Sequence, residues 1–173
     1  PRGIVIPWGG GTPGGISGVN IRRPKGDVKP DAGDYRSRKY QRATGSWSPL
    51  YGTPRERTPR PVSETPVVLV EGEFDALAVL QEAGDLVAPV ATGSTSGARR
   101  ERWRSTLAKA PAVLVSFDEG AAGESASKVW EAALPNGIRW PPHADDTGEM
   151  LEQGGDLRTW VRCGLEAARR SPS

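Results

Sequence analysis

The chain has too few thiol and imidazole groups for several common kinds of site. Its 173 residues include a single cysteine, Cys163, and a single histidine, His143. One cysteine cannot form an internal disulfide, and a structural zinc site needs more Cys or His ligands than these two residues supply. We therefore expect a reduced, cytosolic protein without structural zinc, in which Cys163 is a buried, small apolar residue.

Long apolar runs are also missing from the sequence. None approaches the ~18 residues that a membrane-spanning helix needs, and no signal peptide is visible. Apolar residues make up only 36% of the chain, whereas glycine contributes 22 residues and proline 16. This composition predicts compact cores separated by long loops, and no membrane partner.

The two halves of the chain carry opposite net charges. Residues 1–62 contain 12 Lys and Arg against 4 Asp and Glu, and residues 63–173 contain 11 against 17. The proline-rich segment 53–66 resembles a linker, so we predict one domain over 1–62 and a second over 63–173. The basic half is expected to bind a polyanion and the acidic half to hold cations. The alternative is that these charges only solvate a loop-rich segment.

The second domain alternates short apolar runs with helical patterns. The apolar runs, predicted to be buried strands, cover 66–70, 86–91, 112–117 and 137–140. The predicted helices cover 73–83, 97–109, 122–134, 148–154 and 156–170. This alternation predicts an α/β fold with a parallel-rich sheet flanked by helices. Strand-like segments at 3–8 and 17–23 predict that a small, basic, β-rich subdomain precedes it.

Acidic residues gather where the predicted strands end. They are Glu71, Glu73, Asp75, Asp118, Glu119, Asp145 and Asp146. The carboxyl ends of parallel strands line the ligand-binding crevice of such sheets, so these side chains are expected to converge there. Carboxylates that converge repel one another unless a cation lies among them, which predicts a site for Mg²⁺ or Mn²⁺. Acids at a helix N-terminus also suit the helix dipole, and we favour that simpler role for Glu73.

Three segments resemble the Toprim fold that primases and topoisomerases share. They read "VVLVEGEFDALAVLQEAG", "VAPVATGSTS" and "VLVSFDEGAAGESASKVWEAAL". Upstream, "GIVIPW", "SGVNIRRP" and "RKYQRATGSWSPLYG" are similar to the N-terminal subdomain of bacterial (DnaG-type) primase cores. The segment "DDTGEMLEQGGDLRTWV" resembles the last acidic segment of primases from phages and mobile elements. The resemblance covers roughly residues 3–162.

The resemblance implies a DNA primase catalytic core that makes short primers on single-stranded DNA by metal-dependent nucleotidyl transfer. Glu71 and Asp118 would be the catalytic residues. The expected ligands of Mg²⁺ or Mn²⁺ are Glu71, Asp75, Asp118, Glu119 and Asp146. The residues expected to contact template or nucleotide are Arg22, Arg23, Arg38, Lys39, Thr92, Gly93 and Ser94. The expected partners are a single-stranded DNA template and nucleoside triphosphates, with a replicative helicase as a further candidate.

One position departs from the family pattern. Toprim domains carry Asp-x-Asp after the later strand, whereas this chain has Asp118-Glu119-Gly120. Two metal ions at such a site can activate the attacking oxygen and stabilise the leaving one, and the missing Asp puts the second of these ions in question. Two alternatives to a primase stay open: a Toprim nuclease, with water as the nucleophile, and a catalytically weakened nucleic-acid-binding module.

Overall fold

The structure is a computed structural model. The residues that it describes are 2–9, 15–29, 31, 33–34, 38–46, 50–52, 61–94 and 101–171. The chain divides into two compact units, Pro1–Pro49 and Leu50–Ser173. Tyr51 belongs to the second unit because its backbone exchanges hydrogen bonds of 2.9 and 3.0 Å with Ala91. The boundary predicted after residue 62 stays a prediction, and part of the proposed linker lies outside the described residues.

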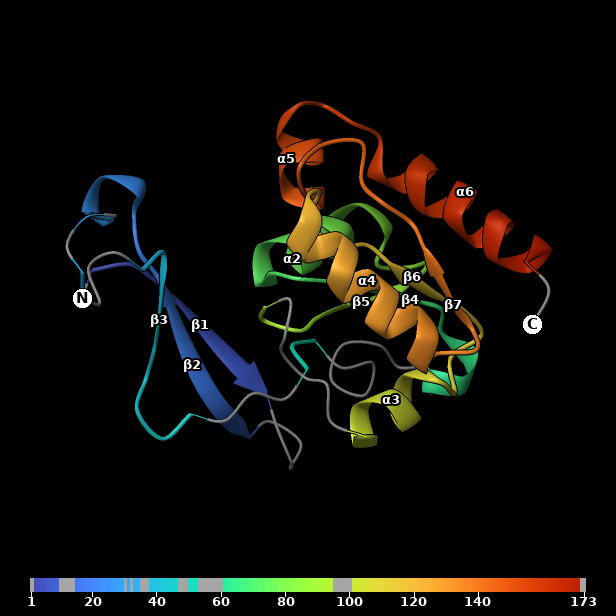
Figure 1. Cartoon of the computed structure of the whole chain (residues 1–173), viewed down its shortest axis with the longest axis horizontal. Helices are drawn as coiled ribbons and strands as arrows, with labels where there is room; N and C mark the ends of the chain where they lie inside the picture. The colour runs from blue at the N-terminus through green and yellow to red at the C-terminus, as the bar shows by residue number, and fades with distance from the viewer. Residues whose placement is uncertain are drawn as a thin grey trace. The chain divides into compact units, whose positions relative to one another are not determined.

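The first unit contains a three-stranded antiparallel sheet, drawn in blue shades in Figure 1. Its strands are β1 (Ile4–Gly9), β2 (Ile16–Arg22) and β3 (Tyr40–Arg42), in the order β1-β2-β3. A short 3-10 helix, η1 (Lys25–Asp27), follows β2. The prediction of a β-rich subdomain is confirmed. Strand β3 was not predicted, since three mostly polar residues show no hydrophobic alternation.

The second unit contains a four-stranded parallel sheet with the order β5-β4-β6-β7. The strands are β4 (Val67–Val70), β5 (Ala88–Ala91), β6 (Val113–Val115) and β7 (Gly137–Arg139), and the 3-10 helix η4 (Val62–Glu64) precedes them. The helices are α2 (Glu73–Ala83), α3 (Glu101–Leu107), α4 (Ala121–Ala133), α5 (Thr147–Glu152) and α6 (Leu157–Arg170). The predicted α/β class and its parallel sheet are confirmed.

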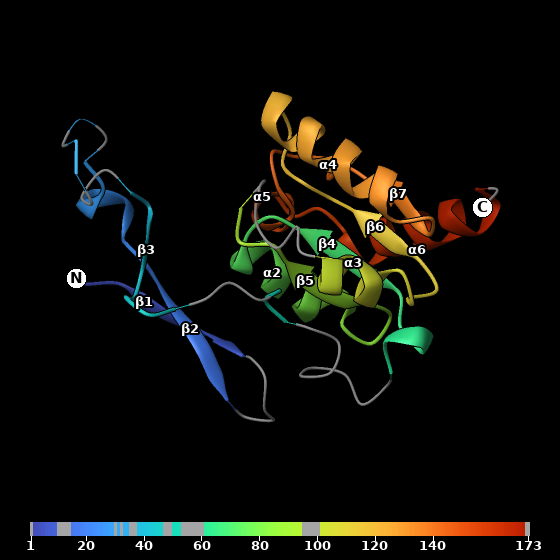
Figure 2. The ribbon, with the colours of Figure 1, turned by 60° about the horizontal axis from the view of Figure 1, so that its bottom comes forward.

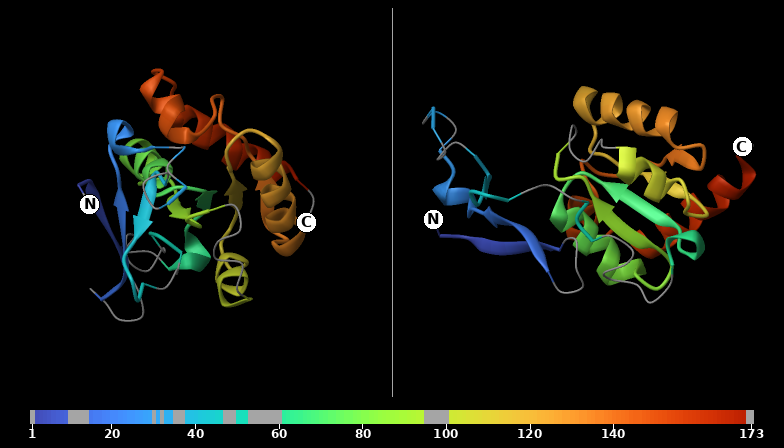
Figure 3. Two further views of the ribbon diagram at one scale, coloured as in Figure 1. Left: turned by 60° about the vertical axis from the view of Figure 1, so that its left-hand side comes forward. Right: turned by 90° about the horizontal axis from the view of Figure 1, so that it is seen from below.

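Helices cover both faces of this sheet. Figures 2 and 3 show α3 and α4 over one face and α2 and α6 over the other, while α5 packs against α2. Successive residues of a strand point to opposite faces, so strands covered on both faces are apolar throughout, as β4, β5 and β6 are. The edge strand β7 is only half-buried and ends in Arg139. Helix α6 lies so close to the sheet that a Cβ on Gly164 would be 2.7 Å from Leu114 Cδ1. A larger residue at 164 would push this helix off the sheet.

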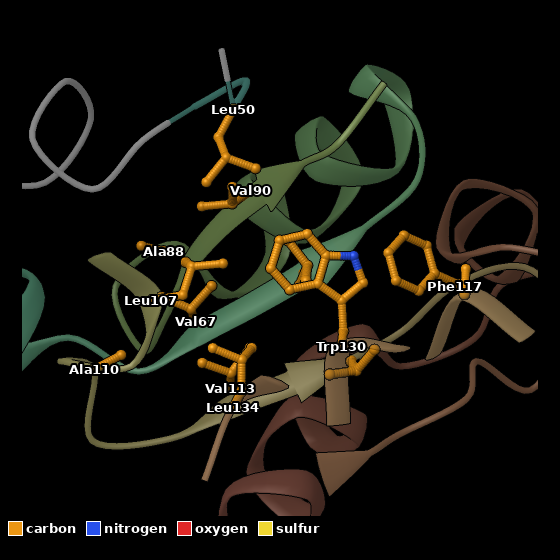
Figure 4. Packing of buried hydrophobic residues seen from close by; sticks show 13 residues of the cluster. Leu50, Val67, Ala88, Val90, Leu107, Ala110, Val113, Phe117, Trp130 and Leu134 are labelled. Atoms are coloured by element: carbon orange, nitrogen blue, oxygen red, sulfur yellow. The ribbon is translucent and has the colours of Figure 1, made fainter. Parts of the chain in front are cut away.

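The main hydrophobic cluster lies under α3 and α4. Val67 of β4, Val113 of β6 and Phe117, just after β6, pack there with Trp130 of α4, which is 1% exposed. Figure 4 shows the Trp130 indole in the middle of the cluster, with Phe117 beside it. Loss of a buried aromatic side chain of this kind costs about 3–5 kcal/mol of stability. This core holds the strands in register, and thereby the loops that carry the acidic residues.

Helix α2 packs against β5, α5 and α6 and buries Ala76, Ala78 and Val79. One detail of side-chain burial differs from the predictions. Cys163 is exposed rather than buried, since the buried side of α6 is formed by residues such as Trp160 and Val161. In the described part of the chain, no helix combines the length and the apolar character needed to cross a bilayer.

Candidate functional site

The first acidic residues lie at the carboxyl end of β4. Glu71 follows the strand directly and is half-buried, and α2 begins two residues later. Asp75 occupies the third position of α2, where its Oδ2 accepts a hydrogen bond of 3.0 Å from the N–H of Gly72. This capping interaction turns the Asp75 carboxylate back toward the end of the strand. The same turn buries Glu73, which is only 2% exposed.

Asp75 lies in a strongly acidic environment. The pKa of its carboxyl group is raised from 3.8 to about 7, first by burial and then by the negative charges of Asp146 and Asp118. Hydrogen bonds from the backbone N–H groups of Gly72 and Gly148 offset only part of this effect. Three carboxyl groups, from α2, from the loop after β6 and from the start of α5, therefore act on one another. Such convergence was expected for acids that follow the carboxyl ends of parallel strands.

Asp118 lies in the loop that joins β6 to α4. Its side chain is half-buried, whereas that of Glu119 is exposed, so adjacent carboxylates face different surroundings. The N–H of Glu119 donates a 2.9 Å hydrogen bond to the carbonyl of Asp145, which ties this loop to the later acidic segment. A Cβ on Gly123 would lie 2.0 Å from the carbonyl oxygen of Asp118. Glycine at 123 is therefore needed for α4 to begin this close to Asp118.

Asp146 caps the N-terminus of α5. Its Oδ1 accepts a 2.6 Å hydrogen bond from the N–H of Glu149, and Glu149 Oε2 accepts one of 3.2 Å from the N–H of Asp145. The Thr147 hydroxyl donates to the backbone carbonyl of Asp75 over 3.2 Å and so joins α5 to α2. Asp146 thus has a structural role in the helix cap and also an electrostatic effect on Asp75.

The loop after β5 lies beside Glu71. The N–H of Gly93 donates a 2.8 Å hydrogen bond to the Glu71 carbonyl, and the Thr92 hydroxyl donates one of 2.8 Å to the Ser94 carbonyl. Gly93 has a φ of 78°, which favours glycine at this turn. The structure therefore brings Thr92, Gly93 and Ser94 to the end of the sheet where the acids lie, and their predicted role in nucleotide binding stays a prediction.

The donor atoms at this edge of the sheet suit a hard divalent cation. They are all carboxylate oxygens, and the repulsion that raises the Asp75 pKa is the kind that a bound cation relieves. Within the described residues, however, no three Asp, Glu, His or Cys side chains form a group that could by itself hold a metal ion. Magnesium is commonly held by one or two carboxylates, with waters and substrate phosphates completing its shell. The carboxylates of Asp75, Asp118 and Asp146 suit a Mg²⁺ ion that is held in part by waters and substrate phosphates.

Gly120 adopts a backbone conformation that aspartate rarely tolerates. Its φ of 102° and ψ of 172° lie in a region occupied almost only by glycine. We expect Gly120→Asp to destabilise the protein by about 1–3 kcal/mol in urea denaturation, and Gly120→Ala to show the same loss because the cause is the backbone. A Gly120→Asp variant as stable as the wild type would contradict this account. The loop that has Gly120 in place of the second Asp therefore adopts a backbone conformation that favours glycine at this position.

A basic groove lies within the first unit. It has a volume of about 700 Å³ and is lined by Arg2, Gly3, Ile4, Arg22, Arg23, Pro24, Val28 and Lys39. Arg22 also donates a 2.8 Å hydrogen bond to the Tyr40 hydroxyl, and its guanidinium carbon lies 5.5 Å from the centre of that ring. The structure thus brings together three of the four predicted phosphate contacts. Arg38 is exposed and does not line the groove.

The sequence of the second unit matches one family model, described as Toprim-like, over residues 68–151. This segment contains the β4–α2 junction, the loop with Asp118 and the cap at Asp146. Residues 68–151 form a Toprim-like domain. A comparison with curated proteins found no match to the chain.

Solved structures with this fold include primase fragments. The chain is similar to the primase fragment of the bacteriophage T7 primase-helicase protein, with 16% identity, a TM-score of 0.65 and 87% of the chain covered. It is also similar to the RNA polymerase domain of Mycobacterium tuberculosis primase DnaG, with 19% identity, a TM-score of 0.61 and 90% of the chain covered. A DnaG primase catalytic domain bound to ssDNA is similar too, with 19% identity, a TM-score of 0.57 and 88% of the chain covered. The chain spans 57%, 54% and 47% of these three chains. At such low identity, the likeness establishes the fold.

One residue of the Toprim domain escaped the sequence analysis although it contacts the loop before Asp118. Arg139 donates hydrogen bonds to the carbonyls of Val115 and Phe117 over 3.2 and 3.1 Å. The only signal in the sequence was an arginine within the predicted apolar strand 137–140. At the end of a strand, an arginine side chain can donate hydrogen bonds to backbone carbonyls of the neighbouring segment that have no strand partner.

Proposed function

We propose that the chain is the catalytic core of a DNA primase, which synthesises short primers on single-stranded DNA by metal-dependent nucleotidyl transfer. The observation that carries this proposal is the electrostatic coupling of Asp75, Asp118 and Asp146 at the carboxyl edge of a Toprim sheet. The fold that the chain shares with three primase structures over 87–90% of its length supports the choice of primase among Toprim enzymes. That shared part includes the small basic unit as well as the Toprim domain.

The roles of the acidic residues follow from their places around the sheet edge. Glu71 and Asp118 would form the catalytic pair, with Glu71 as the candidate acceptor of the proton from the attacking 3′-hydroxyl. Asp75 and Asp146 would help to hold Mg²⁺ or Mn²⁺, whereas the exposed Glu119 contributes least. A bound ion supplies charge neutralisation for the phosphates and lowers the barrier to attack at the α-phosphate. A new phosphodiester bond forms, and pyrophosphate leaves.

The basic groove would receive the phosphates of the template strand. Arg22, Arg23 and Lys39 line a groove whose walls also include apolar side chains, which suits a strand with both phosphates and bases. The DnaG catalytic domain bound to ssDNA supports this role for the fold. The T7 fragment belongs to a primase-helicase protein, so a replicative helicase remains a candidate partner.

Binding of single-stranded DNA should depend steeply on salt if the groove contacts phosphates. Each phosphate contact contributes about 0.7 to the slope of log K against log salt for single strands. We expect the double variant Arg22→Gln/Lys39→Gln to reduce that slope by about 1.4, measured by fluorescence anisotropy of a labelled oligonucleotide. Arg170→Gln, at the end of α6, removes a cation elsewhere and should leave the slope unchanged. Equal slopes for all three proteins would show that the strand binds elsewhere.

The product distinguishes a primase from the alternatives. Wild-type protein is incubated with single-stranded DNA, labelled nucleoside triphosphates and Mg²⁺ or Mn²⁺, and the products are separated on a denaturing gel. Short labelled products support a primase, and shortened template supports a Toprim nuclease. Binding of the template without either product would instead support a nucleic-acid-binding module.

A further inference from the structure

Arg139 is the last residue of β7, next to the last backbone hydrogen bond between β7 and β6. Strand β7 pairs with β6 only from Val113 to Val115, and the last backbone bond runs from the N–H of Trp140 to the Val115 carbonyl over 2.9 Å. Beyond that point β7 offers no further backbone donor to the chain that leads to Asp118. The side chain of Arg139 supplies donors instead. Its Nη1 donates to the Val115 carbonyl over 3.2 Å and to the Phe117 carbonyl over 3.1 Å.

The same guanidinium also reaches the far side of the Asp118 loop. Its Nε lies 3.4 Å from Oε2 of Glu124, which stands in the first turn of α4. The planar guanidinium holds several donors in fixed directions, so one side chain can hold both partners at once. The backbone N–H of Arg139 is itself fixed by a 2.9 Å hydrogen bond to Glu131 Oε1. Arg139 therefore bridges the residue before Asp118 and the helix that follows it.

The carboxylate partner Glu124 is 51% exposed, but the Arg139 side chain itself is only 17% exposed, compared with 38% for Arg158 in its pair with Asp85. A buried carbonyl that loses its donor leaves an unsatisfied polar group. Among the residues that the structure describes, the donor to the Phe117 carbonyl is Arg139. Loss of Arg139 would therefore act first on the peptide unit that precedes Asp118.

We propose that Arg139 is a positioning residue, which fixes the Asp118 loop in the geometry needed to bind a divalent cation. The inference rests on the proposed metal site at Asp118. Residues that orient metal ligands typically change metal affinity by 10- to 100-fold when they are mutated. Gly123 and the Glu119–Asp145 hydrogen bond hold the same loop from other sides, so the fold survives while the carboxylate loses its fixed position.

The test measures Mn²⁺ binding by electron paramagnetic resonance on the full chain without nucleotide. We expect Arg139→Gln to weaken binding by about 10-fold or more. Arg158→Gln is the matched control, because Arg158 also donates to a carbonyl, that of Glu82, and to a carboxylate, that of Asp85. It should leave Mn²⁺ affinity within about twofold, because its pair lies far from Asp118 in the sequence and is more exposed. Equal effects of the two variants would overturn the proposal.

Two further variants keep the test decisive if Arg139→Gln does not fold. Glu124→Gln removes only the second partner and should weaken Mn²⁺ binding by about threefold, whereas Arg139→Lys keeps the charge and should restore part of the affinity. Faster amide hydrogen exchange across residues 117–120 in the metal-free Glu124→Gln protein is also expected. Unchanged affinity and exchange in Glu124→Gln would reject the positioning role. If the wild type makes no primers while these differences persist, the proposed function fails and the inference about Arg139 stands.

Discussion

Replacing Asp118 by asparagine is expected to lower the rate of primer synthesis by at least about a hundredfold. The substitution keeps the size of the side chain and removes only the charge, so the half-buried site should keep its packing. Charge stabilisation by a bound metal is worth several kcal/mol in a transition state, and each 1.36 kcal/mol corresponds to about a tenfold change in rate. The measurement is the initial rate of labelled primer formation at saturating nucleotide, with Mg²⁺ and Mn²⁺ compared.

Two other variants serve as controls for the Asp118→Asn result. Asp156→Asn makes the same chemical change at the N-cap of α6, where asparagine caps as well as aspartate, and its primer synthesis should match the wild type. Glu119→Gln tests the neighbouring acid, whose exposed side chain predicts a loss of less than about threefold. A large loss in Glu119→Gln would restore Glu119 as a ligand. Full activity of Asp118→Asn would remove Asp118 from the catalytic residues.

The sequence was most informative where the physical pattern was regular. The buried strand before Glu71 and the helix 73–83 were predicted because a continuous apolar run is followed by helical periodicity and ended by Gly84. Asp75, Asp118 and Asp146 were expected to converge because they follow the carboxyl ends of predicted parallel strands, and the charges of Asp146 and Asp118 do raise the pKa of Asp75. These are long-range consequences of a repeated local pattern, and so they could be read from one sequence.

Other features depend on backbone geometry or on single contacts, which a sequence pattern does not encode. Gly120 was recognised as a departure from the family, but its positive φ, which makes glycine suit the loop, is visible only in three dimensions. Strand β3 has too few residues for any alternation to appear. Arg139 acts through hydrogen bonds to backbone carbonyls, and any residue type can supply a carbonyl. Its carbonyl partners therefore leave no trace in the sequence.

The grouping of Asp75, Asp118 and Asp146 also lowers the stability of the folded protein, and the effect is greatest at Asp75. Its pKa is 3.8 as a free side chain and about 7 in the fold, where burial and the charges of Asp146 and Asp118 oppose ionisation. Between these two values the unfolded chain releases its proton while the folded protein keeps it. Stability that is present below pH 4 is therefore lost as the pH rises toward 7, and it stays lost above 7. At 1.36 kcal/mol per pKa unit, the upper limit of this loss is about 4 kcal/mol.

Asp75→Asn is accordingly expected to be more stable than the wild type at pH 8 without divalent ions, by about 1–3 kcal/mol. The gain falls short of the upper limit because asparagine has one acceptor oxygen for the two N–H groups of Gly72 and Gly148. The advantage should shrink as the pH falls and vanish near pH 4, where Asp75 is protonated in the fold. Urea denaturation in EDTA from pH 4 to pH 8 measures the difference between the two proteins, in which the other titrating groups cancel.

Divalent ions should reverse this order. A cation that binds only the folded state stabilises it by about 2.7 kcal/mol at a concentration 100 times its dissociation constant. Mg²⁺ or Mn²⁺ should therefore raise the stability of the wild type at pH 8 and raise that of Asp75→Asn much less. Asp156, whose pKa is lowered, provides the control, because the difference between Asp156→Asn and the wild type should stay constant from pH 5 to pH 8. Parallel curves for Asp75→Asn and the wild type, with and without Mg²⁺, would mean that the three carboxyl groups are not kept together to hold a cation.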